Sequence, residues 1–255
     1  MGIETGGKQS VMELSIIASG SNGNCYLLQS AGVSVLFDAG KSFSETAGRM
    51  AALGKDIQEV DGIVLSHAHG DHYQGIGPIA RRLGIPVYAR KQVYLACRQR
   101  LGPVDVRHFE DAFRIGDLEI LPIETSHDVA SCGFVVGRFG IFTDTGCVTA
   151  QMREIISDLD AILIESNYDE RMLMTGPYPL HLKERIASDQ GHLSNEDASD
   201  FIRRYGDHLS QVFLAHLSET NNSADKVRET FESFNGDRPY VVCSRFRQTG
   251  MFRIA

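Results

Sequence analysis

The sequence has no C-x-x-C pair, no apolar run long enough to span a membrane, and no low-complexity linker or short-period repeat. Its five cysteines are scattered, which excludes a disulfide-dense scaffold and predicts a reducing, cytoplasmic compartment. The missing apolar run excludes a membrane role. Because the first residues lack the apolar core of a signal peptide, we expect 1–10 to be a flexible leader or an expression remnant. Residues 11–255 should then form a single domain.

An excess of positive charge is also missing. The formal net charge is −8, and charged residues make up 23% of the chain. Any binding of nucleic acid would therefore need a local basic patch. Two basic stretches are candidates, although solvated faces are the usual explanation for such runs: Arg81, Arg82, Arg90, Lys91, Arg98 and Arg100 in one, and Arg245, Arg247 and Arg253 in the other.

Hydrophobic residues make up 42% of the chain, enough for a sizeable core, and their spacing predicts runs of strands with helices between them. This order predicts mixed sheets covered by helices rather than a strict β-α-β repeat. The pattern predicts a helix over 44–54 ending at Gly54, and a hairpin over 131–146 that turns at Arg138 to Gly140. The segment 166–179 is expected to be a long loop.

One short stretch has no explanation in a hydrophobic core. "VLSHAHGDHYQG", residues 64–75, places His67, His69, Asp71 and His72 within six positions. Two imidazoles two residues apart lie on the same side of an extended segment, so His67 and His69 can hold one metal ion. Asp71 and His72 follow on the same loop, where they can serve a second ion. Histidine nitrogen and carboxylate oxygen suit zinc, manganese or iron better than calcium.

Further metal-capable residues follow apolar strands. His127 follows "LPIETS", Asp144 follows "FGIFT", and His216 follows "QVFLA". Taken alone, each histidine has an ordinary explanation as a hydrogen-bonded residue at a strand end, and Asp144 could be a turn residue. Beside "HAHGDH" the three together favour a site for two metal ions.

The order "HAHGDH", His127, "TDTG", "LAHLS" resembles the metallo-β-lactamase-fold hydrolase superfamily over nearly the whole chain from residue 12. The resemblance implies a four-layer αββα sandwich of two mixed β-sheets flanked by helices, with two divalent ions at one edge. Carried over by position, His67, His69 and His127 would hold one ion. Asp71, His72 and His216 would hold the other, and Asp144 would bridge them.

Longer strings are similar to the small bacterial YycJ (WalJ) group: "ASGSNGNCYLL", "ESNYDERMLMTGPYPLHLKERIASDQGHLSNEDAS" and "LAHLSETNN". This narrower resemblance implies a DNA exonuclease or a related phosphodiesterase. The order Glu165, His192, His216 also resembles the ribonuclease Z branch of the superfamily, in which a glutamate orients a histidine that assists the leaving group. We therefore expect a Glu165–His192 pair, although His192 could also be a plain surface residue.

The ligand set predicts a mechanism. Two divalent ions roughly 3.5–4 Å apart can share a water, lower its pKa and supply a hydroxide at neutral pH. Asp71 would act both as a ligand and as the group that orients this hydroxide, and His192 would donate the proton that the leaving group needs. Asp38 in "LFDAG" either supports a metal-binding histidine or forms a turn.

Other polar segments keep two explanations each. Ser19, Ser21, Asn22 and Asn24 form either a plain hairpin turn or a contact to phosphate. Three side chains of the 166–179 segment pack either against a base or against the protein: Tyr168, Met172 and Tyr178.

The leading hypothesis is a phosphodiesterase acting on nucleic acid, with DNA favoured over RNA and a 5′–3′ exonuclease as the favoured form. The first alternative is a small-molecule hydrolase on the same metals, acting on a thioester or a small phosphodiester. A β-lactamase is disfavoured because Asp144 and the full H-x-H-x-D-H are atypical of that branch. A di-iron enzyme that reduces oxygen would need an added electron-transfer domain, and a non-catalytic role does not fit seven filled ligand positions. The sequence does not predict an oligomeric state.

Overall fold

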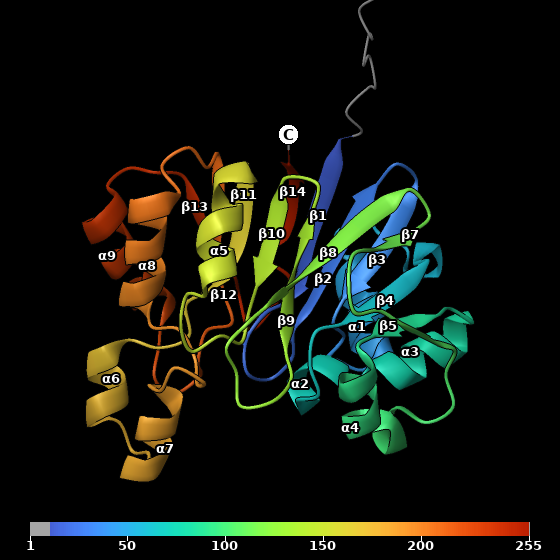
Figure 1. Cartoon of the computed structure of the whole chain (residues 1–255), viewed down its shortest axis with the longest axis horizontal. Coiled ribbons are helices and arrows are strands. Elements are labelled where there is room, and N and C mark those ends of the chain that lie inside the picture. The colour runs from blue at the N-terminus through green and yellow to red at the C-terminus, as the bar shows by residue number, and fades with distance from the viewer. Residues whose placement is uncertain (1–10, 255) are drawn as a thin grey trace, which may run out of the picture.

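The computed structural model describes residues 11–254, so the expected leader lies outside the described residues. Two seven-stranded sheets pack face to face (Figure 1). The strands of the first sheet, in spatial order, are β14 (Gly250–Ile254), β1 (Met12–Ala18), β2 (Cys25–Ser30), β3 (Val33–Phe37), β4 (Gly62–Leu65), β5 (Val87–Ala89) and β6 (Val106–His108). Those of the second are β13 (Tyr240–Val242), β12 (Gln211–Ala215), β11 (Ala161–Glu165), β10 (Phe139–Phe142), β9 (Cys132–Val136), β8 (Leu118–Glu124) and β7 (Phe113–Ile115).

Both sheets are mixed. Strands β3 to β6 are parallel to one another, and so are β10 to β13, whereas the remaining pairs are antiparallel. The last two strands separate, because β13 pairs with β12 and β14 pairs with β1. The carboxyl ends of parallel strands in one sheet point to the same edge, which is where such sheets commonly carry their sites.

Helices cover the outer face of each sheet. The first sheet packs against α1 (Phe43–Ala51), α3 (Ile76–Leu83) and α4 (Lys91–Leu101). The second packs against α5 (Ala150–Ile155), α8 (Asn195–Tyr205) and α9 (Ala224–Asn235). A third cluster lies between the sheets and includes Phe37, Phe134 and Phe213. The result is a four-layer αββα sandwich, which confirms the expected fold class.

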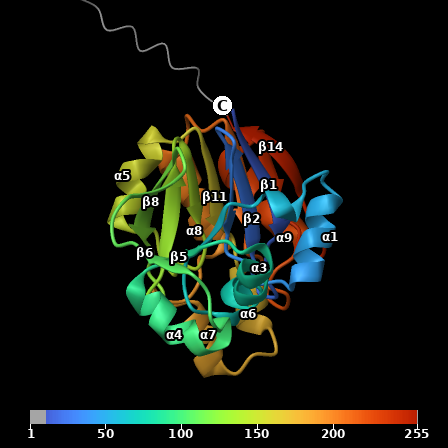
Figure 2. The same cartoon turned by 90° about the vertical axis from the view of Figure 1, so that its right-hand side faces the viewer.

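Three short helices lie at the end of the molecule opposite the C-terminus (Figure 1, Figure 2). They are α2 (Gly70–Tyr73), α6 (Glu170–Thr175) and α7 (Leu180–Ile186). Two 3-10 turns complete the regular elements, η1 (Ile57–Glu59) and η2 (Ile156–Asp158). No helix within residues 11–254 is both long enough and apolar enough to cross a bilayer.

Three local predictions were wrong. The helix expected to reach Gly54 ends at Ala51, because tight turns replace helical hydrogen bonds: the Gly54 N–H donates to the Ala51 carbonyl at 2.9 Å. The hairpin expected to turn at 138–140 turns at 137–138, where Gly137 adopts a positive φ of 55° that suits glycine. The expected loop over 166–179 contains α6, whose first turn is capped by the Asp169 side chain.

Candidate metal centre

Strand ends deliver five of the polar side chains of the site. Asp38 and His216 directly follow β3 and β12, and Glu165 is the last residue of β11. His67 and Asp144 lie two residues beyond β4 and β10. These strands are the parallel ones of each sheet, so their carboxyl ends bring the five side chains to one edge of the sandwich.

Three of these residues adopt a backbone conformation that side chains rarely take. Asp38, Asp144 and His216 have φ values of 57°, 56° and 57°. A residue other than glycine in the left-handed region is strained and persists only when the surrounding structure enforces it. All three residues turn the chain sharply at the end of a strand, which directs their side chains toward the same point.

The first cluster contains His67, His69, His127 and Asp144, whose ligand atoms all lie within 4.8 Å of one another. His69 Nδ1 and His127 Nε2 are 3.2 Å apart. Asp144 Oδ1 lies 3.8 Å from His67 Nε2 and 3.8 Å from His127 Nε2. Three imidazole nitrogens and one carboxylate oxygen at this spacing can surround a single divalent ion.

The second cluster contains Asp71, His72 and His216. Asp71 Oδ2 lies 3.4 Å from His216 Nε2 and 3.5 Å from His72 Nε2. Asp144 also reaches this group, because its Oδ2 is 3.0 Å from His72 Nε2. Asp144 thus contacts both clusters, with Oδ1 near His67 and His127 and also 3.7 Å from His216 Nδ1, and such a position between two groups of ligands suits a bridging carboxylate.

Two histidines of the first cluster are in the neutral form that binds a metal ion. Burial is the main cause that lowers the pKa of both His67 and His69, so these imidazoles are neutral at neutral pH and their lone pairs are available. His67 Nε2 is buried and has no hydrogen-bond partner among residues 11–254. A buried polar atom without a partner is costly, and a bound cation would satisfy it.

Carboxylates raise the pKa of both histidines in the second cluster. Burial lowers the pKa of His72, but Asp144, Asp71 and Asp38 together outweigh burial and raise that pKa well above its usual range. Burial also lowers the pKa of His216, but nearby carboxylates, chiefly Asp144, outweigh burial and raise this pKa to about 10. Carboxylates that hold protons on these imidazoles would also attract a divalent cation, which competes with protons for the same nitrogens.

Hydrogen bonds orient the histidines. Asp38 Oδ2 accepts from His72 Nδ1 at 2.7 Å, and Glu165 Oε1 accepts from His216 Nδ1 at 2.6 Å. His127 Nδ1 donates to the Gly191 carbonyl at 3.0 Å. Partners of this kind fix the tautomer and leave the other ring nitrogen free to bind a metal. Asp38, for which the sequence left two roles open, both contacts a cluster histidine and shapes the turn after β3.

Glu165 and His192 form the pair that the sequence predicted, with His192 Nδ1 2.8 Å from Glu165 Oε1. The buried Glu165 carboxylate also accepts from the Thr145 and Leu193 backbone N–H groups. Burial raises the pKa of Glu165, but His192 and the other donors outweigh it and hold the pKa at about 2. Burial lowers the pKa of His192, but the Glu165 carboxylate outweighs burial and raises this pKa, so Glu165 favours the protonated form of His192.

The position of His192 also allows a second role, that of a metal ligand. Its ring nitrogen lies within 4.8 Å of ligand atoms of Asp144, Glu165 and His216, so the geometry alone also admits it as a ligand. The His192 atom that approaches Asp144 is Nδ1, at 3.8 Å from Asp144 Oδ1, and this same atom forms the short hydrogen bond with Glu165. Because Nδ1 is already used, this arrangement favours a proton donor over a ligand.

A small cavity lies beside the clusters. Its volume is about 210 Å³, and His127, Asp128, Tyr178, Arg185 and His192 are among the residues that line it. His192 therefore stands between Glu165 and a space that a substrate can enter.

Comparison of the sequence with known families identifies the family of this chain. A sequence profile of the β-lactamase superfamily domain matches residues 34–217, which include both clusters, Asp38, Glu165 and His192. The chain belongs to the metallo-β-lactamase superfamily.

Two relatives make the assignment narrower. Exodeoxyribonuclease WalJ of Streptococcus pneumoniae is 36% identical over 229 residues, which cover 85% of this chain and 85% of the relative. Exodeoxyribonuclease YycJ of Bacillus anthracis is 35% identical over 249 residues, covering 92% of this chain and 93% of the relative. The resemblance to the WalJ and YycJ group is thereby confirmed, and the chain is a metal-dependent hydrolase with a divalent-metal site.

A solved structure supports the fold. The metallo-β-lactamase-fold protein YhfI of Bacillus subtilis superimposes with a TM-score of 0.73 at 18% identity, covering 96% of this chain and 99% of YhfI. At this identity the likeness shows that the two proteins share the superfamily fold and nothing narrower.

Several polar residues around the metallo-β-lactamase site were not predicted. Asn167 Nδ2 donates to the His216 carbonyl at 2.8 Å, and Asn222 Nδ2 donates to the carbonyls of Ser166 and Asn167 at 2.9 Å. This network ties the turn after β11 to the turn after β12. Asparagine directly after a buried strand, in "ESN", was the available signal, but the partner lies far along the chain.

The loop before β2 also contributes. Asn24, for which the sequence left a turn or a phosphate contact open, points into the second cluster: its Nδ2 is 2.9 Å from His72 Nε2 and 3.3 Å from Asp71 Oδ2. Tyr168 is buried against the protein, whereas Tyr178 lines the small cavity.

Asp128 was missed as well, although it directly follows His127. Its Oδ1 lies 3.3 Å from His69 Nε2, and its Oδ2 accepts from Arg185 at 2.7 Å. Asp128 therefore orients a histidine of the first cluster and links it to α7.

Proposed function

We propose that this chain is a nuclease with two divalent metal ions that degrades DNA from the 5′ end. The observation that carries the proposal is the Glu165–His192 pair at 2.8 Å, beside two clusters of metal-binding side chains. A charged histidine next to such clusters suits cleavage of a phosphodiester, where the departing sugar oxygen must be protonated. Both curated relatives described above are named exodeoxyribonucleases, which supports DNA as the substrate.

The proposed ligand set follows the clusters. His67, His69 and His127 would hold one ion; Asp71, His72 and His216 would hold the other; Asp144 would bridge the two. Zinc, manganese and iron all suit these ligands. When bound, a pair of divalent ions supplies an activated water and offsets negative charge on the phosphodiester.

The remaining steps belong to the side chains. Glu165 favours the protonated form of His192 and fixes the ring through Nδ1, which leaves the other nitrogen free to donate a proton to the leaving oxygen. Asp71, which reaches the second cluster from α2, would also orient the attacking water. Glu165 binds His216 as well, so one carboxylate couples the proton donor to the metal cluster.

We also propose that the chain works in the cytoplasm. All five cysteines are free thiols, and four of them are buried. Burial is the main cause that raises the pKa of Cys97 to about 11 and that of Cys132 to about 12, so neither is a reactive thiolate. Free structural cysteines support a reducing, cytoplasmic location.

The test is a nuclease assay on the purified chain with Mn²⁺ or Zn²⁺. Single- and double-stranded DNA labelled at either end would be compared, with RNA of the same sequence and an Asp71→Ala control. We expect nucleotides to be released from the 5′ end and release to vanish in the control. Turnover of a glutathione thioester or of bis(p-nitrophenyl) phosphate, without cleavage of any nucleic acid, would instead support a small-molecule hydrolase.

A further inference from the structure

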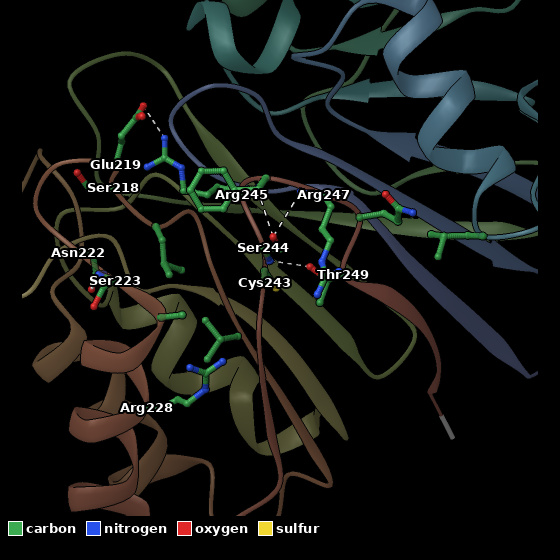
Figure 3. Close-up of a pocket in the computed structure, with 16 residues that line it drawn as sticks. Ser218, Glu219, Asn222, Ser223, Arg228, Cys243, Ser244, Arg245, Arg247 and Thr249 are labelled. Atoms are coloured by element: carbon green, nitrogen blue, oxygen red, sulfur yellow. Dashed lines mark hydrogen bonds and ion pairs between the residues drawn. The ribbon is translucent and has the colours of Figure 1, made fainter.

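A second, larger cavity lies immediately beyond the metal clusters, with a volume of about 740 Å³ (Figure 3). Leu217 and Ser218 line it and directly follow His216, a residue of the second cluster. Gly20 holds the cavity wall close to the loop that carries Asn24, because a Cβ at this position would lie 3.0 Å from Arg245 Cβ and 3.2 Å from the Leu217 carbonyl oxygen. The cavity and the clusters therefore share one edge of the sandwich.

The segment 243–249 joins β13 to β14 and forms one wall of this cavity. The Ser244 N–H donates to Thr249 Oγ1 at 2.7 Å, and the Phe246 N–H donates to Ser244 Oγ at 3.2 Å. Arg49 of α1 donates to the Phe246 carbonyl at 3.3 Å. The loop is thus held in one shape from within and from α1, so the side chains it presents are positioned in advance.

Arginines outnumber acidic residues in the lining. Arg245 and Arg247 belong to the loop, and Arg228 lies on α9 on the opposite side of the cavity in Figure 3, where it forms an ion pair with Asp225 at 2.7 Å, whereas the acidic lining residue is Glu219. Arg245 is 8% exposed and forms an ion pair with Glu219, yet its Nε has no hydrogen-bond partner among residues 11–254. Arg247 is exposed and forms no ion pair within the described part of the chain.

Phe246 adds an aromatic surface between these arginines. It is 79% exposed, the highest value among the large hydrophobic residues of the described chain. The Arg245 guanidinium lies 5.1 Å from its ring centroid, so one face of the ring is supported by a cation. The other face is available for a planar partner. Cationic side chains that alternate with an exposed aromatic ring are typical of surfaces that bind single-stranded nucleic acid.

We propose that this cavity, with its 243–249 loop, is a subsite for single-stranded nucleic acid next to the metal centre. Arg247 and Arg228 contact a backbone phosphate, and Phe246 stacks on a base of a nucleotide that lies beyond the scissile bond. This subsite rests on the proposed nuclease function, and it gives an acidic chain the local basic patch that binding requires. It also favours a substrate with an unpaired strand, because the faces of bases inside a duplex are covered by the stacked neighbouring bases and are not free for Phe246.

The test measures kcat/KM for single-stranded DNA of increasing length, for wild type, Arg247→Ala and Phe246→Ala. The matched control is Arg114→Ala, because Arg114 is an exposed arginine of β7, at the edge of the second sheet opposite β13. We expect Phe246→Ala to lose about 5–150-fold on long strands and much less on a dinucleotide. The slope of the logarithm of the binding constant against the logarithm of the salt concentration is negative, and we expect Arg247→Ala to make it less steep by about 0.7.

Three results would overturn the subsite: an equal loss at every length, no loss in either variant, or the same loss in Arg114→Ala. Thermal melting of the variants confirms that they fold, since both side chains are exposed. If the wild-type chain cleaves no DNA of any length, the proposed function fails instead. Equilibrium binding of the same strands then decides the subsite: tight binding by wild type that Phe246→Ala and Arg247→Ala weaken supports it, and no binding refutes it.

Discussion

Replacing His192 by alanine separates proton donation from metal binding. His192 is 22% exposed at its side chain and is hydrogen-bonded to the buried Glu165, whose carboxylate raises the pKa of His192. Loss of a positioned general acid slows a reaction by about 10²–10⁴-fold. This range corresponds to about 2.7–5.4 kcal/mol of lost transition-state stabilisation. We expect His192→Ala to slow DNA cleavage by this factor.

The assay compares two leaving groups. Cleavage of DNA expels a sugar oxygen that needs a proton, whereas a p-nitrophenyl ester of a nucleotide expels p-nitrophenolate, which leaves without one. His192→Ala should therefore lose far more activity on DNA than on the ester, and its metal content should match that of wild type. The reasoning is refuted if both substrates are slowed equally. It is also refuted if the variant loses metal, because His192 would then be the ligand that its distance to Asp144 and His216 also allows.

Three further predictions concern two residues beside the clusters and one residue of the core. Asp38→Asn should weaken metal binding by about 10–100-fold, because the charged acceptor of His72 Nδ1 is removed; metal titration followed by calorimetry measures this. Gly40→Ala should lower metal content and activity without replacing any ligand, since a Cβ there would lie 1.8 Å from the Asp71 carbonyl oxygen. Phe134→Ala should lower the free energy of unfolding by about 3–5 kcal/mol in chemical denaturation, because this ring is buried between the sheets.

Controls for these variants come from the same chain. Gly48 lies in α1 with open space around its Cβ position, so Gly48→Ala should keep full metal content and gain about 0.5–1 kcal/mol of stability. Normal metal affinity in Asp38→Asn would show that its hydrogen bond to His72 does not support the metal. Full activity in Gly40→Ala would mean that the loop carrying Asp71 moves freely. A loss below about 1 kcal/mol in Phe134→Ala would contradict close packing between the sheets.

The cluster residues could be predicted from the sequence because local rules place them. His67, His69, Asp71 and His72 are close in space simply because they are close along the chain. His216 and Asp144 could be predicted because each follows an apolar strand, and parallel strands deliver their ends to one edge. The fold class followed from the alternation of strand and helix patterns together with the family resemblance.

The parts that escaped prediction depend on contacts between distant segments. Asn167 and Asn222 are 55 residues apart, and no local pattern indicates that they bond. The same holds for the two last strands, which follow each other in sequence but join different sheets. The basic character of Arg247 was visible in the sequence, but its position beside the metal edge depends on how β13 and β14 diverge.

Metal content measured together with nuclease activity tests the central claim most directly. Elemental analysis of the purified chain should find about two divalent ions per chain in wild type. Removal of both ions by a chelator should abolish cleavage of 5′-labelled DNA, and Mn²⁺ or Zn²⁺ should restore it, whereas Asp144→Ala should bind fewer ions and stay inactive. Cleavage of DNA by the fully metal-free chain, or full activity in metal-depleted Asp144→Ala, would contradict the account.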